Sequence, residues 1–500
     1  MTEVVQVRLK DYSQLLIETD HSTGAELTDF FSFFAEGYKF SPAYRNKMWD
    51  GMIRLYNHRD KQLPIGLYAY LQNFCEARGY ILEVLDNQLY GLPIADNKVP
   101  PSLDYLNSHT FTSRGKPIEH RDYQLRAITT AITEHRTLLL SPTASGKSLI
   151  IYSIMLYYME NYDKDILIIV PTTSLVNQMY GDFADYSEFD QAFSAEDSCH
   201  MIYSGKEKNH DKRITISTWQ SVYKLGSAWF KKFGMIIGDE AHTFKAKSLV
   251  SIMGKSTEAQ FRIGTTGTID NIAVNKLVLE GSFGPVYRVT STKALMDEGS
   301  LAALDIKILA LKYPDVESKI VSKLKYPQEM DYIVTHEKRN NFIANLAIAQ
   351  TGNTLILFQF VGKHGKPLHE LINTKVGDDR EVFYVSGETD ANLREDVRRI
   401  TETKSNAILV CSLGTFSTGV NIRNLHNIIF ASPSKAQIKI LQSIGRGLRK
   451  SDNGQDTKLF DIADDFHWKS KKNYTLRHAA ERVKIYASEK FNFKIHEVKM

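Results

Sequence analysis

The sequence has few cysteines and no long hydrophobic run. Its 500 residues include three cysteines, Cys75, Cys199 and Cys411, which lie far apart and form no CxxC pair. This spacing excludes a disulfide framework and a cysteine-based zinc site, and it favours a reducing compartment. No apolar run approaches the roughly 18 residues that cross a bilayer, and the first residues lack the pattern of a signal peptide. We therefore expect a cytoplasmic protein with no membrane partner.

The chain also has little excess charge, but that excess is unevenly distributed. The formal net charge is +4, whereas residues 469–500 carry nine Lys or Arg against three Asp or Glu. A basic terminal segment on a near-neutral body suggests contact with a polyanion, although a solubilising tail would have the same composition. Residues 473–491 have apolar side chains at helical spacing, which predicts an amphipathic helix packed on the preceding domain. Its apolar positions are Leu476, Ala479, Ala480, Val483, Ala487 and Phe491, and the basic side chains expected to face outward are Lys471, Lys472, Arg477, Arg482 and Lys484.

Short β-rich runs alternate with helical stretches along most of the chain. TLLL, DILIIVP, RITIST, FGMIIGDE and FRIGTTGT are near-continuously apolar, as parallel strands buried on both faces require. The alternation returns after about residue 337, while residues 312–336 are less periodic and indicate a connection. This pattern predicts two α/β units, each with a doubly wound parallel sheet. We place the boundaries at residues 1–95 for a small α+β domain, 96–117 for a linker, 118–300 and 301–470 for the two units, and 471–500 for the basic helix.

The N-terminal domain interleaves aromatic and basic side chains between residues 36 and 62. Aromatic rings stack on bases and basic side chains hold phosphates, so the pattern suits DNA binding. The same aromatic side chains could instead form the core of a small domain. We expect core positions for most of the aromatic residues and DNA contact for the basic ones. The aromatic residues are Tyr38, Phe40, Tyr44, Trp49 and Tyr56, and the basic residues are Lys39, Arg45, Lys47, Arg54 and Arg59.

A phosphate-binding loop is expected after the first strand of the first α/β unit. The segment SPTASGKS, Ser141 to Ser148, lies between the strand TLLL and a helix, which is the context that such a loop needs. Lys147 would reach the β- and γ-phosphates of ATP, and the Ser148 hydroxyl would bind Mg²⁺. The strict pattern has glycine where Ser141 stands, so an ordinary strand–loop–helix turn is the alternative. The residues expected to bind ATP here are Thr143, Ala144, Ser145, Gly146, Lys147 and Ser148.

Two adjacent carboxylates follow a second buried strand. The run GMIIG precedes Asp239 and Glu240, and Asp239 lies 92 residues after Lys147. Ligands of open α/β sheets bind at this carboxyl end of the strands. We expect Asp239, together with Ser148, to hold Mg²⁺, and Glu240 to orient and deprotonate the attacking water. A surface turn is the alternative for such a carboxylate pair.

Asp239-Glu240-Ala241-His242 resembles the DEAH motif of superfamily-two helicases, and further motifs of that family lie around it in order. They are RDYQ (121–124), PTTSLVNQ (171–178), TWQS (218–221), TTGT (265–268), TFSTGVN (415–421) and QSIGRGLR (442–449). The resemblance implies two RecA-like lobes in tandem that use ATP and Mg²⁺. It also implies that Arg446 and Arg449 act as arginine fingers on the γ-phosphate. Other residues that it assigns to the nucleotide are Arg121, Gln124, His242, Gly419, Asn421 and Gln442.

The same resemblance implies that a DNA strand lies across both lobes and is held through its phosphates. Hydroxyls, amides and basic side chains suit such contacts because they bind a backbone without reading sequence. Polar residues after strands are also common in loops that bind nothing. The implied contacts are Thr172, Thr173, Gln178, Thr218, Gln220, Gln359, Lys363, Thr418 and Gly419.

Over nearly its full length the chain resembles the UvsW family of recombination and fork-remodelling DNA helicases from T-even phages. The resemblance rests on FFSFFAEGYKFSPAYRNKMWDGMIRLY, ILIIVPTTSLVNQM, LQSIGRGLRK and ERVKIYASEKFNF. It implies 3′ to 5′ translocation and unwinding of junctions, forks, D-loops and R-loops in recombination, replication and repair. The expected partners are branched or single-strand-containing DNA and RNA–DNA hybrids, in the cytoplasm of the host.

Three other functions fit parts of the pattern. The motor subunit of a restriction enzyme would need a nuclease cluster or a methylase partner, and we find no such cluster on a separate domain of the sequence. An RNA helicase is weakly disfavoured because many RNA-directed members have His where Gln442 begins its motif. A non-catalytic DNA-binding scaffold would not need Lys147, Asp239 and Glu240 together. The sequence does not fix oligomeric state, step size or protein partners.

Overall fold

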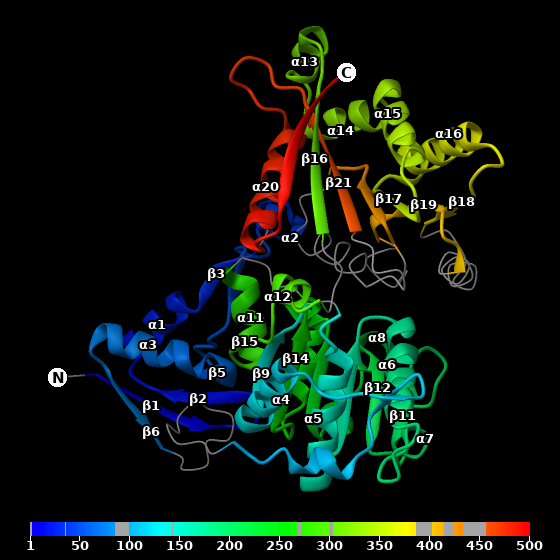
Figure 1. The fold of residues 1–500 in the computed structure, drawn as a ribbon. Coiled ribbons are helices and arrows are strands. Elements are labelled where there is room, and N and C mark those ends of the chain that lie inside the picture. The colour runs from blue at the N-terminus through cyan, green and yellow to red at the C-terminus, as the bar shows by residue number, and fades with distance from the viewer. Residues whose placement is uncertain are drawn as a thin grey trace. The chain divides into compact units, whose positions relative to one another are not determined.

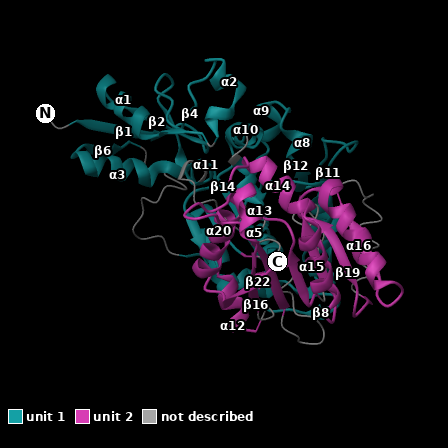
Figure 2. Ribbon diagram, turned by 90° about the horizontal axis from the view of Figure 1, so that it is seen from above, with its two compact units in different colours: residues 1–141, 146–289 teal, residues 142–145, 290–500 magenta. Residues whose placement is uncertain are grey.

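The computed structural model describes two compact units, each built around a seven-stranded parallel sheet. Unit 1 comprises residues 1–141 and 146–289, and unit 2 comprises residues 142–145 and 290–500 (Figure 2). The two seven-stranded sheets confirm the predicted α/β fold with two RecA-like lobes. A separate four-stranded sheet confirms the small N-terminal α+β domain. No helix in the described part of the chain is both long and apolar enough to cross a membrane. The described residues are 3–35, 37–85, 100–142, 144–245, 247–267, 273–299, 304–386, 403–414, 425–433 and 457–500.

The N-terminal part of unit 1 is a four-stranded mixed sheet with the order β5-β2-β1-β6 (Figure 1). Strand β1 pairs antiparallel with β2 and parallel with β6. Val5 and Val7 of β1 alternate with more exposed neighbours and are fully buried against Leu71 and Phe74 of α3, as one buried face of a sheet requires. The elements are β1 (Val4–Leu9), β2 (Gln14–Glu18), α1 (His21–Phe30), β3 (Ser32–Phe34), η1 (Tyr38–Phe40), α2 (Pro42–Arg45), β4 (Met52–Arg54), β5 (Gln62–Pro64), η2 (Ile65–Leu67), α3 (Tyr68–Arg78) and β6 (Ile81–Val84).

Between α1 and β5 the chain forms a short extension with its own two-stranded sheet, residues 32–35 and 37–54, which we call the aromatic extension. Its strands β3 and β4 pair antiparallel, and the ring of Phe34 stacks on that of Tyr38 with 4.5 Å between centroids. Gly51 has a φ of 82°, and a Cβ there would collide with the Tyr38 ring, so this turn requires glycine. Phe40 is 76% exposed, whereas Tyr56, outside the extension, is buried in the domain core. The expectation that most of these aromatic residues are core is therefore wrong, because the extension is too small to enclose them.

The N-terminal sheet is fixed to the helix α11 (Ala273–Phe283) of the same unit. Leu277 of that helix is buried in the hydrophobic core of the N-terminal domain. The Tyr70 hydroxyl donates to Glu280 Oε2 at 2.6 Å, and the Arg136 guanidinium donates to the Tyr12 carbonyl. Truncation of the N-terminal domain would therefore expose apolar surface and unpair buried polar groups in the rest of unit 1.

The large sheet of unit 1 has the order β11-β12-β10-β13-β14-β9-β15, and its paired strands are all parallel. Every residue of β12, β13 and β14 is buried, which confirms the prediction of strands covered on both faces. The remaining elements of the unit are η3 (Asp104–Ser108), β7 (Thr112–Ser113), β8 (Lys116–Pro117), α4 (Asp122–Glu134), β9 (Arg136–Leu140), α5 (Lys147–Asn161), β10 (Asp165–Val170), α6 (Thr173–Tyr186), α7 (Ala195–Ser198), β11 (Cys199–Ile202), β12 (Ile214–Thr218), α8 (Trp219–Val222), α9 (Ser227–Phe230), β13 (Phe233–Asp239), η4 (Ala241–Lys245), α10 (Lys247–Lys255), β14 (Phe261–Thr266) and β15 (Val286–Arg288).

The sheet of unit 2 repeats this plan with the order β18-β19-β17-β20-β21-β16-β22. Residues 312–336, expected to be a connection, instead contain the helices α13 and α14 (Figure 1). Helix α14 buries Met330, Ile333 and Val334, whose i, i+3, i+4 spacing is helical but too short to be distinctive. The elements are α12 (Thr292–Asp297), β16 (Leu304–Lys312), α13 (Asp315–Val321), α14 (Tyr326–Thr335), α15 (Glu337–Ile348), β17 (Thr354–Phe358), η5 (Val361–Gly365), α16 (Lys366–Val376), β18 (Val382–Val385), β19 (Ile408–Ser412), β20 (Asn427–Phe430), β21 (Thr457–Asp465), α20 (Tyr474–Ser488) and β22 (Phe493–Lys499).

The C-terminal segment forms the predicted helix, and its buried face overlaps the predicted one only in part, since Ala479 and Phe491 are buried as expected. Helix α20 packs on β21 with Ala479, Ile485 and Tyr486 buried, whereas Ala480 and Ala487 are exposed. Arg482, expected to face outward, is buried: its guanidinium donates to Asp461 of β21, with Nη2 2.7 Å from Oδ1. The chain then continues as β22, which pairs parallel with β16 at the edge of the sheet. A buried carboxylate on the sheet therefore decides which face of α20 turns inward.

We expect Arg482→Leu to destabilise unit 2 by about 3–5 kcal/mol, because the substitution leaves the buried Asp461 carboxylate without its cation. Urea denaturation followed by circular dichroism would measure the loss, with Arg477→Leu on the exposed face of the same helix as the control. Replacing both partners, by Arg482→Leu with Asp461→Leu, should recover most of the stability. A loss of less than about 1 kcal/mol for Arg482→Leu alone would contradict a structural role for the pair.

Candidate nucleotide site and strand-facing edge

The phosphate loop connects the end of β9 to the start of α5. Gly146, the residue before α5, has a φ of 79°, and a Cβ there would collide with Nε2 of Gln124. The Gln124 amide is held in turn, because its Oε1 accepts a hydrogen bond from the Arg121 N–H at 2.8 Å. The RDYQ motif and the predicted phosphate loop therefore lie in direct contact. The loop backbone can approach a phosphate closely only with glycine at this position.

The parallel register of three strands brings the predicted hydrolytic residues together. Asp239 at the end of β13 is aligned with Thr265 of β14, and Thr265 is aligned with Leu139 of β9, just before the phosphate loop. The Thr265 hydroxyl donates to Asp239 Oδ1 at 2.7 Å. These residues are 26 positions apart in sequence. The segment TTGT thus contacts the acidic motif directly, through its first threonine.

Glu240 faces the loop lysine. Its Oε1 lies 3.8 Å from Lys147 Nζ. Gly267 is also close to this amine, since a Cβ added to that glycine would lie 3.8 Å from the same Nζ. His242 Nδ1 is 3.4 Å from Glu240 Oε2 and 3.1 Å from the Thr266 hydroxyl. Glu240 has a φ of 51°, in the left-handed region that is strained for glutamate. Strained backbone of this kind is typical of functional sites, and here it turns the carboxylate toward the lysine.

The electrostatics of the site favour a bound cation. Asp239 is buried, and burial together with the neighbouring Glu240 raises the pKa of its carboxyl above the usual value, against the opposing effects of Lys147 and Thr265. Glu240 Oε2 is also buried and receives no hydrogen bond from the described residues. Ser148 adds a hydroxyl oxygen at the start of α5, so the available donors are the oxygens that Mg²⁺ prefers. No group of three or more His, Cys, Asp or Glu in the described part of the chain could hold a metal. Mg²⁺ usually binds through one or two carboxylates together with substrate phosphates, and this set of oxygens fits that arrangement.

A second set of predicted residues lies along the neighbouring strands. Val170 of β10 is aligned with Thr218 of β12, so their following loops lie side by side. Gln220 Nε2 donates to the Pro171 carbonyl at 3.3 Å. Thr173 and Gln178, both on α6, are exposed. Thr218 is buried, and its hydroxyl lies 2.9 Å from Ser221 Oγ. Its side chain is therefore poorly placed to contact a DNA strand.

The α6 helix begins at this edge and ends at the nucleotide site. The Thr172 hydroxyl caps the helix by accepting a hydrogen bond from the Leu175 N–H at 3.3 Å. At the opposite end, the Tyr186 hydroxyl lies 2.8 Å from Ser148 Oγ. The sequence gives no signal for this contact, because the two residues are 38 positions apart and Tyr186 belongs to no motif.

Two of the four residues predicted to bind a DNA strand in unit 2 follow β17, and both are described. Gln359 is exposed, and its backbone N–H donates to Ser432 Oγ at 3.1 Å. Lys363 Nζ forms an exposed ion pair with Asp331 at 2.9 Å. Exposed pairs of this kind are weak, so a phosphate could displace Asp331.

Several predicted residues lie outside the described residues and remain predictions. They are Thr143 in the phosphate loop, Thr268, Thr418, Gly419, Asn421, Gln442, Arg446 and Arg449.

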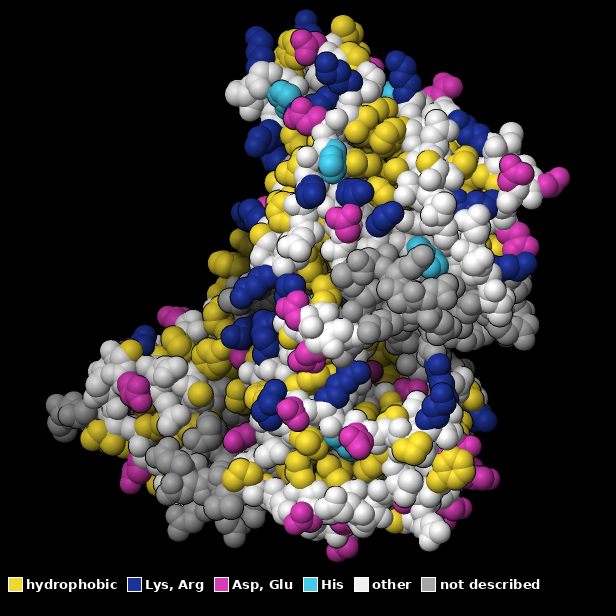
Figure 3. Space-filling view, in the orientation of Figure 1, with side chains coloured by type: hydrophobic (Ala, Val, Ile, Leu, Met, Phe, Trp, Pro, Cys, Tyr) yellow, Lys and Arg dark blue, Asp and Glu magenta, His cyan; other side chains and the backbone are white. Residues whose placement is uncertain are grey.

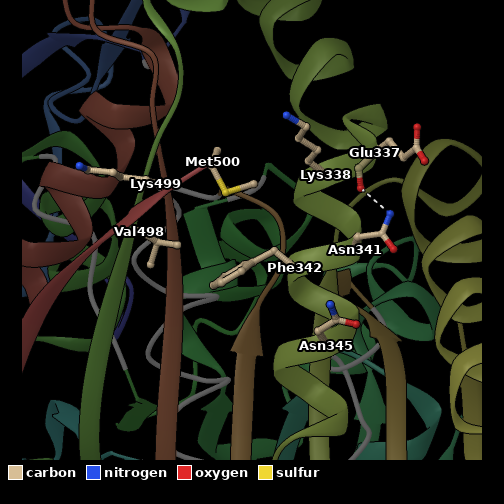
Figure 4. A pocket seen from close by; sticks show the side chains of 8 residues that line it. All are labelled: Glu337, Lys338, Asn341, Phe342, Asn345, Val498, Lys499 and Met500. Carbon is tan, nitrogen blue, oxygen red and sulfur yellow. Dashed lines mark hydrogen bonds between the residues drawn. The ribbon is translucent and has the colours of Figure 1, made fainter.

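Unit 2 also has a surface cavity of about 410 Å³ between α15 and β22 (Figure 4). Phe342, Val498 and Met500 give it apolar lining, and Lys338 and Lys499 are among its polar lining residues. None of the predicted nucleotide or strand-binding residues lines it.

Comparison with known proteins relates this geometry to a family. Residues 117–271 match the family described as "Type III restriction enzyme, res subunit", and residues 337–451 match "Helicase conserved C-terminal domain". Residues 4–85 match "DNA helicase UvsW, N-terminal". The chain is 36% identical over 512 residues to the ATP-dependent DNA helicase uvsW of Enterobacteria phage T4, covering 99% of this chain and 100% of the relative. The chain belongs to the UvsW family of helicases.

Two further comparisons agree with this placement. The crystal structure of T4 UvsW matches with a TM-score of 0.52 and 34% identity over 100% of both chains. The DNA 3′-5′ translocase XPB2 of Sulfurisphaera tokodaii is 25% identical, over 67% of this chain and 80% of that protein. As a member of the UvsW family, the chain is an ATP-dependent helicase, and the predicted fold is confirmed.

Proposed function

We propose that this helicase hydrolyses ATP to drive 3′ to 5′ movement on branched DNA during recombination, replication and repair. The observation that carries the proposal is the contact between motifs far apart in sequence, in which Thr265, Asp239, Glu240 and Lys147 converge at one edge of the sheet. The 3′ to 5′ direction is supported by the relative that is described as a DNA 3′-5′ translocase. Junctions, forks, D-loops and R-loops are the proposed substrates.

The proposed chemistry follows from the positions of the side chains. Lys147 would bind the β- and γ-phosphates, and Ser148 and Asp239 would hold Mg²⁺, whose charge favours attack on the γ-phosphate. Glu240 would orient the attacking water and accept its proton on the carboxylate. His242 lies between Glu240 and Thr266 and would position the carboxylate. Arg446 and Arg449 would supply positive charge from the second lobe.

The DNA strand is proposed to lie along the edge of the sheet where β10 and β12 end. Thr172, Thr173, Gln178 and Gln220 would contact its phosphates, and the buried Thr218 would act only by holding Ser221. Gln359 and Lys363 would serve the same purpose in unit 2, and Thr418 and Gly419 are proposed contacts from the sequence. Contacts of this type bind any sequence, as a translocating enzyme requires.

The aromatic extension is proposed as an additional DNA contact. Phe40 and Met48 are 76% and 82% exposed, and Lys39 and Lys47 are exposed beside them without a carboxylate partner among the described residues. Figure 3 shows lysine and arginine side chains at several places on this face, with acidic side chains among them. Exposed apolar side chains between unpaired cations match a DNA end, whose bases offer flat faces and whose phosphates are anionic.

We expect Phe40→Ala to weaken binding of a four-way junction by about 1–3 kcal/mol, the usual value of one aromatic–base contact. Fluorescence anisotropy at fixed salt would measure the affinity, since salt alone changes it strongly. Phe189→Ala is the matched control, because Phe189 is 57% exposed in the same unit but belongs to no predicted DNA contact. Point variants are preferable to truncation, which would expose Leu277. Equal affinity of Phe40→Ala and the unmodified protein would remove the extension from the proposal.

The substrate class is tested by comparing strand displacement on forked DNA, a four-way junction, a D-loop, an RNA–DNA hybrid and double-stranded RNA. The proposal requires ATP-dependent displacement on the branched DNA substrates. Displacement confined to double-stranded RNA would favour an RNA helicase instead.

A further inference from the structure

The Tyr186 hydroxyl is 2.8 Å from Ser148 Oγ, the oxygen proposed to hold the divalent cation. Tyr186 is half-buried at the last position of α6, and its ring packs 5.6 Å from that of Tyr152 of α5. Phe183, one turn earlier on α6, packs 5.2 Å from the same Tyr152 ring. The end of α6 is therefore held against the helix that starts the nucleotide site, and the phenol is fixed beside Ser148.

The hydrogen bond determines how the serine oxygen can act as a ligand. A hydroxyl has one proton and two lone pairs, and a ligand oxygen must turn a lone pair toward the cation. If Ser148 donates its proton to the Tyr186 oxygen, a lone pair of Ser148 is free to face the nucleotide. Groups that orient a metal ligand in this way usually change metal affinity 10- to 100-fold when they are removed.

We propose that Tyr186 is a positioning residue, which fixes the Ser148 hydroxyl as an oxygen ligand for nucleotide-bound Mg²⁺. It acts through Ser148 by accepting the serine proton, and its own proton is left for another acceptor.

The position of Tyr186 on α6 also suggests how DNA could regulate ATP hydrolysis through the contact between Tyr186 and Ser148. This part of the inference rests on the proposed DNA path. Helix α6 is 14 residues long, or about 21 Å. It is capped by Thr172 at the proposed strand-binding edge and ends at Tyr186. If a bound DNA strand shifts the start of α6, the Tyr186 phenol should shift relative to Ser148, because a packed helix moves as one body. DNA binding would thereby alter the orientation of a metal ligand and the rate of hydrolysis.

The first test measures metal-dependent nucleotide binding rather than turnover. Binding of the fluorescent, non-hydrolysable analogue mant-AMP-PNP would be titrated with MgCl₂ in the unmodified protein and in Tyr186→Phe. We expect the Mg²⁺ concentration for half-maximal binding to rise about tenfold or more in the variant, with binding in EDTA unchanged. Tyr180→Phe is the control, because Tyr180 is a half-buried tyrosine on the same helix with no hydrogen bond to Ser148. A midpoint for Tyr186→Phe within twofold of the unmodified protein would overturn the proposal.

A double-substitution cycle separates positioning from a loss of packing. In a Ser148→Ala background, Tyr186→Phe should have no further effect on the Mg²⁺ midpoint, because the oxygen that it orients is absent. An equal shift in both backgrounds would show that the tyrosine acts without Ser148 and would also overturn the proposal.

The regulatory consequence is tested by phosphate release with and without single-stranded DNA at saturating Mg²⁺. Tyr186→Phe is expected to lose most of the stimulation by DNA while binding DNA with unchanged affinity. Full stimulation in the variant would overturn the coupling through α6. If the unmodified protein itself showed no stimulation, the proposed function would fail, whereas the Mg²⁺ titration would still decide the role of Tyr186.

Discussion

Glu240→Gln is expected to lower kcat for ATP hydrolysis by about 10²–10⁴-fold, the usual contribution of a positioned general base. The carboxylate lies 3.8 Å from Lys147 Nζ and has one buried oxygen that receives no hydrogen bond from the described residues. Glutamine keeps the size of the side chain but cannot accept a proton from water, so ATP should still bind. Phosphate release measures turnover, and binding of a fluorescent nucleotide measures affinity.

Two comparison variants make this result specific. Glu258→Gln removes an exposed carboxylate that pairs with Lys164 elsewhere in unit 1, and it should leave kcat unchanged. Lys147→Ala should also abolish hydrolysis, but with weaker nucleotide binding, because it removes the cation at the phosphates. If Glu240→Gln kept kcat within a few-fold of the unmodified protein, Glu240 would not be the base.

Replacing either Arg446 or Arg449 by alanine should lower kcat by about 10³–10⁵-fold, as for arginine fingers in other phosphoryl-transfer enzymes. This corresponds to roughly 4–7 kcal/mol of the activation barrier. Nucleotide affinity should change far less, because these cations act on charge that develops in the transition state. Single-turnover hydrolysis would separate the chemical step from product release.

Arg477→Ala provides the matched control for the arginine variants. Arg477 is exposed on α20 and stacks on Tyr474 at 4.6 Å, so its loss should leave hydrolysis unchanged. Hydrolysis within tenfold of normal in both Arg446→Ala and Arg449→Ala would exclude arginine fingers at these positions.

The sheets could be predicted from the sequence because parallel strands covered on both faces must be almost entirely apolar. This pattern is present in β13, in which every residue is buried. Helices α13 and α14 escaped prediction because they are short and their apolar residues are few. The face of α20 was mispredicted from Ala480 and Ala487, because small side chains give a weak apolar signal and Arg482 finds a buried partner in Asp461.

The residues of the candidate nucleotide site could be proposed from motifs, but their contacts could not. Residue types and order identified Lys147, Asp239 and Glu240, and the strand register then placed Thr265 against Asp239. The contact between Tyr186 and Ser148 depends on how α6 packs against α5, which no local pattern encodes. Thr218 belongs to a motif expected to contact DNA, yet its side chain is buried. The sequence did not predict this, because hydropathy alone does not show which way a threonine at the end of a β-strand points.

The central claim, that hydrolysis at this site is coupled to DNA, is tested most directly by one measurement. Phosphate release by the unmodified protein would be followed with and without a four-way DNA junction, at saturating ATP and Mg²⁺. The rate should be severalfold higher with the junction, with no such increase for Glu240→Gln. An identical rate with and without DNA in the unmodified protein would contradict coupling between hydrolysis and DNA.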